Sequence, residues 1–136
     1  MTIIEYSLNN NNNNNHYHRA LENGNYINIL TYRKNGEPVS TPVWFIIKDN
    51  KIFIRTSNKS GKFKRIKNNN NVKFALCNIR GKIKGEWHNG LAKLEPNNKW
   101  VFAKINKKYG IFAHLMNIIY KIKKMDIIIL SIELRA

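Results

Sequence analysis

The segment from Thr56 to Arg65 reads Thr-Ser-Asn-Lys-Ser-Gly-Lys-Phe-Lys-Arg, which places hydroxyl groups, a glycine and basic side chains close together. Where such a loop leads into a helix, backbone N–H groups and the positive end of the helix dipole attract an anion. The segment lacks the Gly-x-x-x-x-Gly-Lys-Ser/Thr spacing of a P-loop, so it predicts another kind of phosphate site. A capped basic helix that only faces solvent is the alternative. The candidate anion ligands are Thr56, Ser57, Ser60, Gly61 and Lys62.

Arg55 stands directly before this loop and can add a guanidinium fork, which suits a phosphate group. Lys62 and Arg65 are three residues apart, so a helix brings them to one face, while Phe63 and Ile66 share another. The pattern predicts a short helix with one basic and one apolar side.

A proline lies inside the alternating segment "PVSTPVWFIIK", residues 38–48. Proline has no N–H to donate to a neighbouring strand, so it is found at sheet edges, strand starts and bulges. One interpretation of Pro42 is a plain edge strand. The other is that pairing stops there, and that Ser40, Thr41 and Val43 offer N–H and hydroxyl groups to a flat polar heterocycle.

Six strands must hold these residues in place, and the sequence predicts them at 25–33, 38–48, 51–57, 72–79, 86–95 and 126–134. Asn35-Gly36 is a typical hairpin turn. Helices are expected at 59–69, 99–109 and 111–122. Consecutive hairpins with one late return strand predict a mainly β fold with some α (α+β), a small antiparallel Greek-key barrel with short helices.

Two further patterns concern packing and domain limits. Ile111, Leu115, Ile118 and Ile122 form one stripe of the last helix, which predicts a core face or a dimer interface. The uninterrupted tract Asn9–Asn15 cannot bury apolar surface. We therefore expect a flexible segment over residues 1–15 and one domain over residues 16–136.

The composition is strongly basic, with 24 Lys+Arg against 8 Asp+Glu and a net charge of +16. This favours anionic partners, although the abundance of Lys, Asn and Ile is also typical of an A- and T-rich genome. The apolar runs fall short of the ~20 residues of a membrane-spanning helix, so we expect no membrane partner. A lone cysteine and the lack of a secretory signal predict a cytoplasmic protein.

Other chemistry-bearing residues are weak candidates. His16 and His18 form an isolated pair, so no metal site is predicted. Cys77 has no partner cysteine and is expected to be a buried, inert thiol. Trp44, Trp87 and Trp100 could stack on a ring, but tryptophan in a small protein is usually part of the core.

Four segments, "TYRKNGEPVSTPVWF", "IRTSNKSGKFKRIKNNNNV", "ALCNIRGKIKGEW" and "KYG", resemble the pyridoxamine 5′-phosphate oxidase-like flavin-binding split barrels. Within that group the chain resembles the branch whose members are described as F420-dependent. The resemblance runs from about Tyr26 to the C-terminus. It implies a six-stranded split barrel, a homodimer with cofactor at the subunit interface, and a small-molecule substrate.

The resemblance also implies roles for particular residues. The loop with Thr56, Ser57, Ser60 and Lys62 matches the segment that holds the cofactor phosphate, and Ser40–Val43 matches the strand along the flavin or deazaflavin ring. Arg80 and Trp87 fall where family members face the partner's cofactor. The predicted function is an F420- or FMN-dependent oxidoreductase that transfers a hydride. The alternatives are a small nucleic-acid-binding barrel, which no RNA-recognition motif supports, and a cofactor carrier without turnover.

Overall fold

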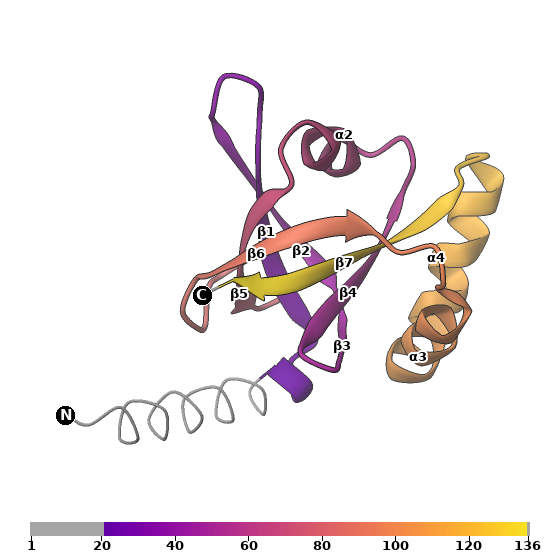
Figure 1. The fold of residues 1–136 in the computed structure, drawn as a ribbon. Helices are drawn as coiled ribbons and strands as arrows, with labels where there is room; N and C mark the ends of the chain where they lie inside the picture. The colour runs from indigo at the N-terminus through magenta and orange to yellow at the C-terminus, as the bar shows by residue number, and fades with distance from the viewer. Residues whose placement is uncertain (1–20, 136) are drawn as a thin grey trace.

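A computed structural model describes residues 21–135, and these form one curled antiparallel sheet with three helices (Figure 1). The predicted N-terminal segment and the boundary at residue 16 lie outside the described residues. The strands are β1 (Tyr26–Tyr32), β2 (Pro38–Trp44), β3 (Ile46–Lys48), β4 (Lys51–Ser57), β5 (Asn71–Cys77), β6 (His88–Leu94) and β7 (Ile127–Arg135). The helices are α2 (Gly61–Asn68), α3 (Lys99–Tyr109) and α4 (Ile111–Ile122).

The strand order is β2-β1-β5-β6-β7-β4-β3, and every neighbouring pair is antiparallel. The two outermost strands, β2 and β3, are separated in sequence by Phe45 alone. One continuous stretch therefore pairs with β1 through its first half and with β4 through its second, which closes the curled sheet. The predicted mainly β split barrel is confirmed, and the count of seven strands arises because the predicted second strand divides at Phe45.

The turns follow from the residues that occupy them. Gly36 has a φ of +88°, a conformation that glycine adopts readily, and the Arg33 N–H donates to the Glu37 carbonyl to close the hairpin between β1 and β2. Asp49 and Asn50 both have positive φ between β3 and β4, as a two-residue hairpin loop requires. These two turns set the register that brings Pro42 and Arg55 to the same part of the molecule.

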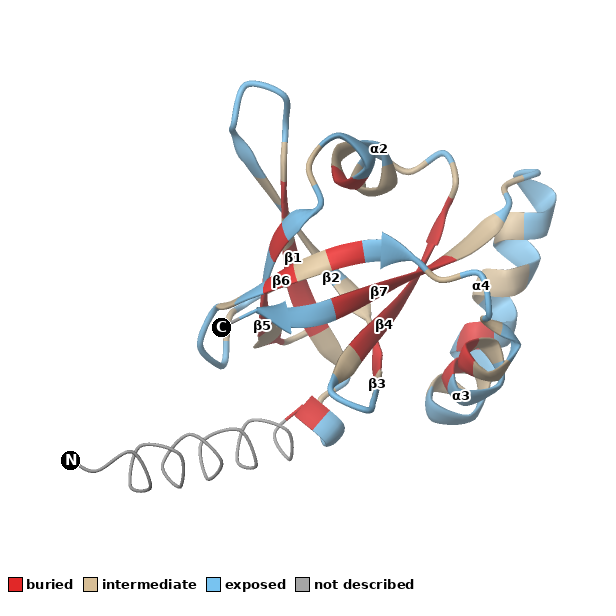
Figure 2. Cartoon of the chain, viewed as in Figure 1, coloured by how far each residue is buried: buried red, intermediate tan, exposed pale blue. Residues whose placement is uncertain are grey.

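Apolar side chains form two clusters, because the sheet buries both of its faces over β4 (Figure 2). The first fills the barrel with residues from β1, β4, β5, β6 and β7, and Ile66 of α2 joins it. The second lies between the sheet and α3, where Val101 and Ile105 meet Ile46, Phe53 and Ile129. Burial on both faces holds β4 firmly, and β4 carries Arg55, Thr56 and Ser57.

The apolar stripe of α4 is exposed in this chain, not part of its core. Ile111, Leu115, Ile118 and Ile122 are 51–75% exposed, while Ala113 on the opposite face is fully buried. Figure 2 shows α4 with its outer side free, next to α3. In the described part of the chain, no helix has the length and apolar character to cross a membrane.

Candidate functional site

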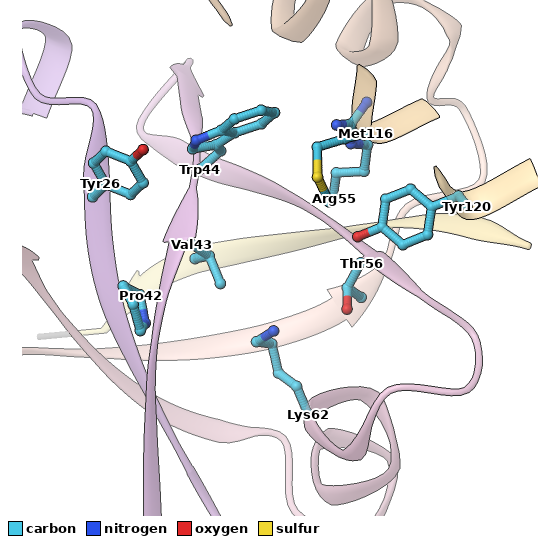
Figure 3. A pocket seen from close by; sticks show the side chains of 9 residues that line it. All are labelled: Tyr26, Pro42, Val43, Trp44, Arg55, Thr56, Lys62, Met116 and Tyr120. Carbon is cyan, nitrogen blue, oxygen red and sulfur yellow. The ribbon is translucent and has the colours of Figure 1, made fainter. Parts of the chain in front are cut away.

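A pocket of about 260 Å³ opens between β2, β4, α2 and α4 (Figure 3). It brings together side chains that are far apart in the sequence, from three strands and two helices. Five residues predicted from the sequence line it, and four others join them. The predicted ones are Pro42, Val43, Arg55, Thr56 and Lys62, and the others are Tyr26, Trp44, Met116 and Tyr120.

Pro42 lies within β2, an outermost strand of the sheet, and does not interrupt the pairing of β2 with β1. The β1–β2 ladder runs without a break from Tyr26 opposite Trp44 to Tyr32 opposite Pro38, and Asn28 faces Pro42 within it. The strand divides instead at Phe45, three residues later. Of the two interpretations of Pro42, the structure therefore agrees with the plain edge strand. The pocket lies beside this edge strand.

Ser40 and Thr41 lie on β2 but do not line the pocket. The Ser40 hydroxyl donates to Asn28 Oδ1, and Asn28 Nδ2 donates to the Gly81 carbonyl at 3.2 Å. Thr41 Oγ1 is buried and has no hydrogen-bond partner within residues 21–135. Of the two hydroxyl donors expected on β2, Ser40 is thus already bonded to Asn28, and Thr41 has no hydrogen-bond partner among the described residues.

Arg55 is the most unusual charged group in the site, because only 8% of it is exposed. Its Nη1 donates to Asn117 Oδ1 at 2.6 Å, and its guanidinium lies 5.6 Å from the Trp44 ring and 5.8 Å from the Tyr120 ring. Burial lowers the pKa of Arg55 from its ordinary value, with a smaller opposing effect from Tyr120. No carboxylate of residues 21–135 pairs with it, so the pocket holds a buried cation without an anion.

The loop before α2 uses its hydroxyl groups to build the helix start. Ser60 is the N-cap of α2, and its Oγ accepts from the Phe63 N–H at 3.1 Å and from the Thr56 hydroxyl at 3.0 Å. Ser57 Oγ accepts from the Lys59 N–H at 3.1 Å. Within the described chain, the first-turn N–H groups of Gly61 and Lys62 have no carbonyl partner, and they remain as donors at the positive end of α2.

Lys62 reaches from this first turn into the pocket, toward Val43 and Thr56 (Figure 3). It is half-buried. Burial lowers the pKa of Lys62, and the nearby Arg65 lowers it further. Arg65 itself turns away, since its Nε donates to Thr31 Oγ1 at 2.7 Å.

Arg80 and Trp87 do not reach this pocket. Both lie in the connection between β5 and β6 and are exposed, Trp87 by 41%. The turn there is held by Asn78, whose Oδ1 accepts from the Arg80 and Lys82 N–H groups. Any role for these two residues in a cofactor site would require a second chain.

Sequence patterns missed the part of the pocket that α4 supplies. Ala113, Met116, Asn117 and Tyr120 recur at helical spacing on the face that turns toward the sheet, opposite the more apolar outer face. The stronger apolar stripe of α4 lies on its outer face, away from the pocket, so the periodicity did not indicate the inner face. A polar residue at position 117 between Met116 and Tyr120 was the available signal for a functional inner face.

The remaining candidates from the sequence have ordinary roles. Cys77 is a buried free thiol whose pKa is raised by burial, as expected of an inert cysteine. Trp100 packs edge-on against Phe53 in the second core cluster. No group of three or more potential metal ligands occurs in the described residues. The chemistry available in the pocket is binding of a planar, anionic molecule between aromatic walls and two cations.

Comparison with known proteins agrees with the architecture. The family profile of pyridoxamine 5′-phosphate oxidase matches residues 14–133. No curated protein sequence matches the chain. Solved structures with the same fold include a putative pyridoxamine 5′-phosphate oxidase from Listeria innocua (TM-score 0.67, 14% identity, 90% of this chain and 93% of that one).

Two further neighbours differ in what their names say they do. One is an F420 reductase (TM-score 0.62, 20% identity, 85% of this chain and 90% of that one). The other is the haem storage protein HutZ from Vibrio cholerae (TM-score 0.67, 11% identity, 89% of each chain). At these identities the neighbours show the fold alone, whereas the family profile covers nearly the whole sequence. The chain therefore belongs to the pyridoxamine 5′-phosphate oxidase family.

Proposed function

We propose that the pocket binds a phosphorylated flavin-type cofactor, F420 or FMN, and that the protein uses it to transfer a hydride to or from a small organic substrate. The observation that carries this proposal is Arg55, a buried guanidinium with no carboxylate partner in residues 21–135. A cation in that position is stabilised when an anionic ligand enters.

The two ends of such a cofactor match the two halves of the pocket. Lys62 and the first-turn N–H groups of α2 would hold the phosphate, with Thr56 beside them. The ring would lie along β2 at Pro42 and Val43, between Trp44 and Tyr120. The cofactor supplies the hydride chemistry, and the chain supplies position and electrostatics, so no acid or base residue is needed in the pocket.

Fewer observations bear on the choice between F420 and FMN than on the presence of an anion-binding pocket. The surplus of basic residues on α2 fits the acidic tail of F420, but only Lys62 of that group lines the pocket. Arg65 binds Thr31, and Lys67 lies 4.7 Å from the Phe63 ring centroid. F420 remains the preferred cofactor because a structural neighbour bears that name and because the α2 surface stays strongly basic.

A second copy of the chain would complete the site. The pocket volume of about 260 Å³ lies just below the ~300–1,000 Å³ of ordinary small-molecule sites. α4 faces the pocket through Met116 and Tyr120, and it presents six exposed apolar side chains on its other side. We propose that this outer face packs against a partner chain, so that the cofactor lies at the subunit interface. The six are Ile111, Phe112, Leu115, Ile118, Ile119 and Ile122.

Titration of the purified protein with F420, FMN, hemin and a single-stranded oligonucleotide tests the proposal. Binding of F420 or FMN at micromolar concentrations, seen as a change in cofactor fluorescence, is the expected result. Binding of hemin, without binding of F420 or FMN, would indicate a haem-binding function like that named for the structural neighbour HutZ. Oligonucleotide binding that survives physiological salt, without flavin or F420 binding, would support a nucleic-acid role instead.

Turnover separates an enzyme from a carrier. If the protein is an oxidoreductase, bound cofactor that has been reduced will be reoxidised faster when the correct acceptor is added. A carrier binds the same cofactor at the same site, and no acceptor changes the rate of reoxidation. The binding site is common to both, so the pocket variants described below test binding in either case.

A further inference from the structure

The division between β2 and β3 leaves the backbone of one buried residue, Phe45, outside the strand ladders. Phe45 is fully buried, β2 ends at Trp44 and β3 begins at Ile46. Buried N–H and C=O groups need hydrogen-bond partners, and an unpaired one costs stability. The end of α3 supplies those partners across more than sixty residues of sequence.

Tyr109 and Lys108 together satisfy this backbone. The Phe45 N–H donates to Tyr109 Oη at 2.9 Å. Tyr109 Oη also lies 2.8 Å from the carbonyl oxygens of Phe45 and Asn25, one of which takes its single proton. Lys108 Nζ donates to the Phe45 carbonyl at 2.9 Å and lies 4.1 Å from the Phe45 ring centroid.

The same tyrosine also supports a wall of the pocket. Its ring stacks on the Trp44 indole with centroids 4.5 Å apart and an angle of 11° between the planes. Trp44 lines the pocket, with the Arg55 guanidinium 5.6 Å from its ring, whereas Tyr109 does not line it. Tyr109 thus contacts both the Phe45 backbone, where β2 ends, and the Trp44 ring, which a planar ligand in the pocket would meet.

The protonation states fit this role. Burial raises the pKa of the Tyr109 hydroxyl, with smaller effects from the Phe45 backbone and from Tyr26, so the hydroxyl keeps its proton to donate. Burial lowers the pKa of Lys108 to about 8. Either form of the Lys108 amine has N–H groups to donate to the Phe45 carbonyl.

We infer that Tyr109 is a positioning residue, which with Lys108 fixes the strand division at Phe45 and so holds the Trp44 ring as a wall of the ligand pocket. It acts on the planar part of the ligand through Trp44 and leaves the anion-binding end at Lys62 unchanged. The inference rests on the proposed function for its ligand, but the position of Trp44 can be measured in the ligand-free protein.

The test compares Tyr109→Phe, which keeps the ring but removes the hydroxyl, with Tyr32→Phe, a half-buried tyrosine away from this pocket. Three quantities are measured: the affinity for FMN or F420, the affinity for inorganic phosphate, and the near-ultraviolet circular dichroism of Trp44. The Trp44 signal is obtained by subtracting the spectrum of Trp44→Phe in each background. We expect cofactor affinity to fall about threefold to tenfold, the effect of one or two lost hydrogen bonds, with phosphate affinity unchanged and the Trp44 signal altered.

Equal losses of cofactor and phosphate affinity would overturn the inference, because they indicate general damage to the fold. Unchanged affinities with an unchanged Trp44 signal would overturn it as well. If Tyr109→Phe does not fold, the same three measurements are made on Lys108→Met, with Lys107→Met as its control. The same two outcomes would then overturn the inference. If the wild-type protein binds neither cofactor, the proposed function fails, and the Trp44 signal of the ligand-free variants alone decides whether Tyr109 positions that ring.

Discussion

At the scale of single residues, the proposed cofactor site depends on two cations that face one pocket. Arg55 is buried on β4 and held by Asn117, and Lys62 extends from the first turn of α2. The sequence indicated both, because each stands in or beside a loop rich in hydroxyl groups. What the sequence did not indicate is their burial, which depends on α4 covering Arg55 and on β2 lying opposite Lys62.

Replacement of Lys62 by alanine is expected to weaken cofactor binding by about 1.5–3 kcal/mol, the range for hydrogen bonds to charged groups. Folding stability will change little, since the lysine is half-buried and burial disfavours its charge in the free protein. Fluorescence titration of the variant measures the effect, and Lys64→Ala, an exposed lysine on the same helix, is the control. Equal affinity in wild type and Lys62→Ala would remove Lys62 from the phosphate site.

We expect Lys108 to make the free energy of unfolding depend on pH. Burial lowers its pKa from 10.5 to about 8 in the folded chain. Between these two values the unfolded state binds more protons than the folded state, so the free energy of unfolding rises as pH rises across that window. Urea denaturation at the two ends of the window should show a smaller rise for Lys108→Met than for wild type or Lys107→Met. The same rise in all three would show that Lys108 is not responsible.

At the scale of elements, the start of α2 serves both the fold and the site. The Ser60 hydroxyl caps the helix and accepts from Thr56, while the neighbouring N–H groups remain available to a ligand. The anion-site and capped-helix interpretations of this segment are therefore compatible. The cap orients the N–H groups that an anion would need.

Two substitutions of Ser60 separate these roles. Ser60→Ala removes the cap and is expected to lower the free energy of unfolding by about 1 kcal/mol. Ser60→Asp keeps a capping oxygen and so preserves stability, but its negative charge next to Lys62 should weaken cofactor binding severalfold. Thermal denaturation and cofactor titration of both variants measure the two effects. Unimpaired cofactor binding by Ser60→Asp would show that the anion does not lie at this helix end.

The elements also show which features sequence patterns can predict. Strand alternation, the Asn35-Gly36 turn and the helix periodicity predicted nearly every element, because these are local properties. The division at Phe45 was missed, since alternation continues through residues 38–48 and the break is stabilised by Tyr109 and Lys108, far along the chain. Tyr120 was missed as a pocket residue for the same reason, and Trp44 was considered for ring stacking but assigned to the core. Their proximity to Arg55 depends on how α4 packs on the sheet.

At the scale of the whole molecule, the single chain leaves its pocket partly open and the apolar outer face of α4 uncovered. Both features are explained if two copies associate through the outer face of α4. Trp87 and Ile79, between β5 and β6, are also exposed apolar side chains that a partner chain could cover. The pocket would then be completed by residues from a second chain.

Ile118→Glu is expected to convert a dimer into a monomer, because it places a charge in the middle of the apolar face of α4. His114→Glu adds a negative charge at an exposed position on the same helix, beside that face, and should leave the dimer intact. Light scattering coupled to size-exclusion chromatography measures both masses. A monomeric wild-type protein, or a dimer that Ile118→Glu leaves unchanged, would show that this face is not the interface.

The most direct test of the central claim is a crystal structure of the protein grown with F420 or FMN. We expect the cofactor phosphate within hydrogen-bond distance of Lys62 and the first turn of α2, with the ring along β2 next to Trp44. It would be contradicted by density for the cofactor elsewhere. A pocket filled by side chains of a second copy, leaving no space for a tricyclic ring, would contradict it equally.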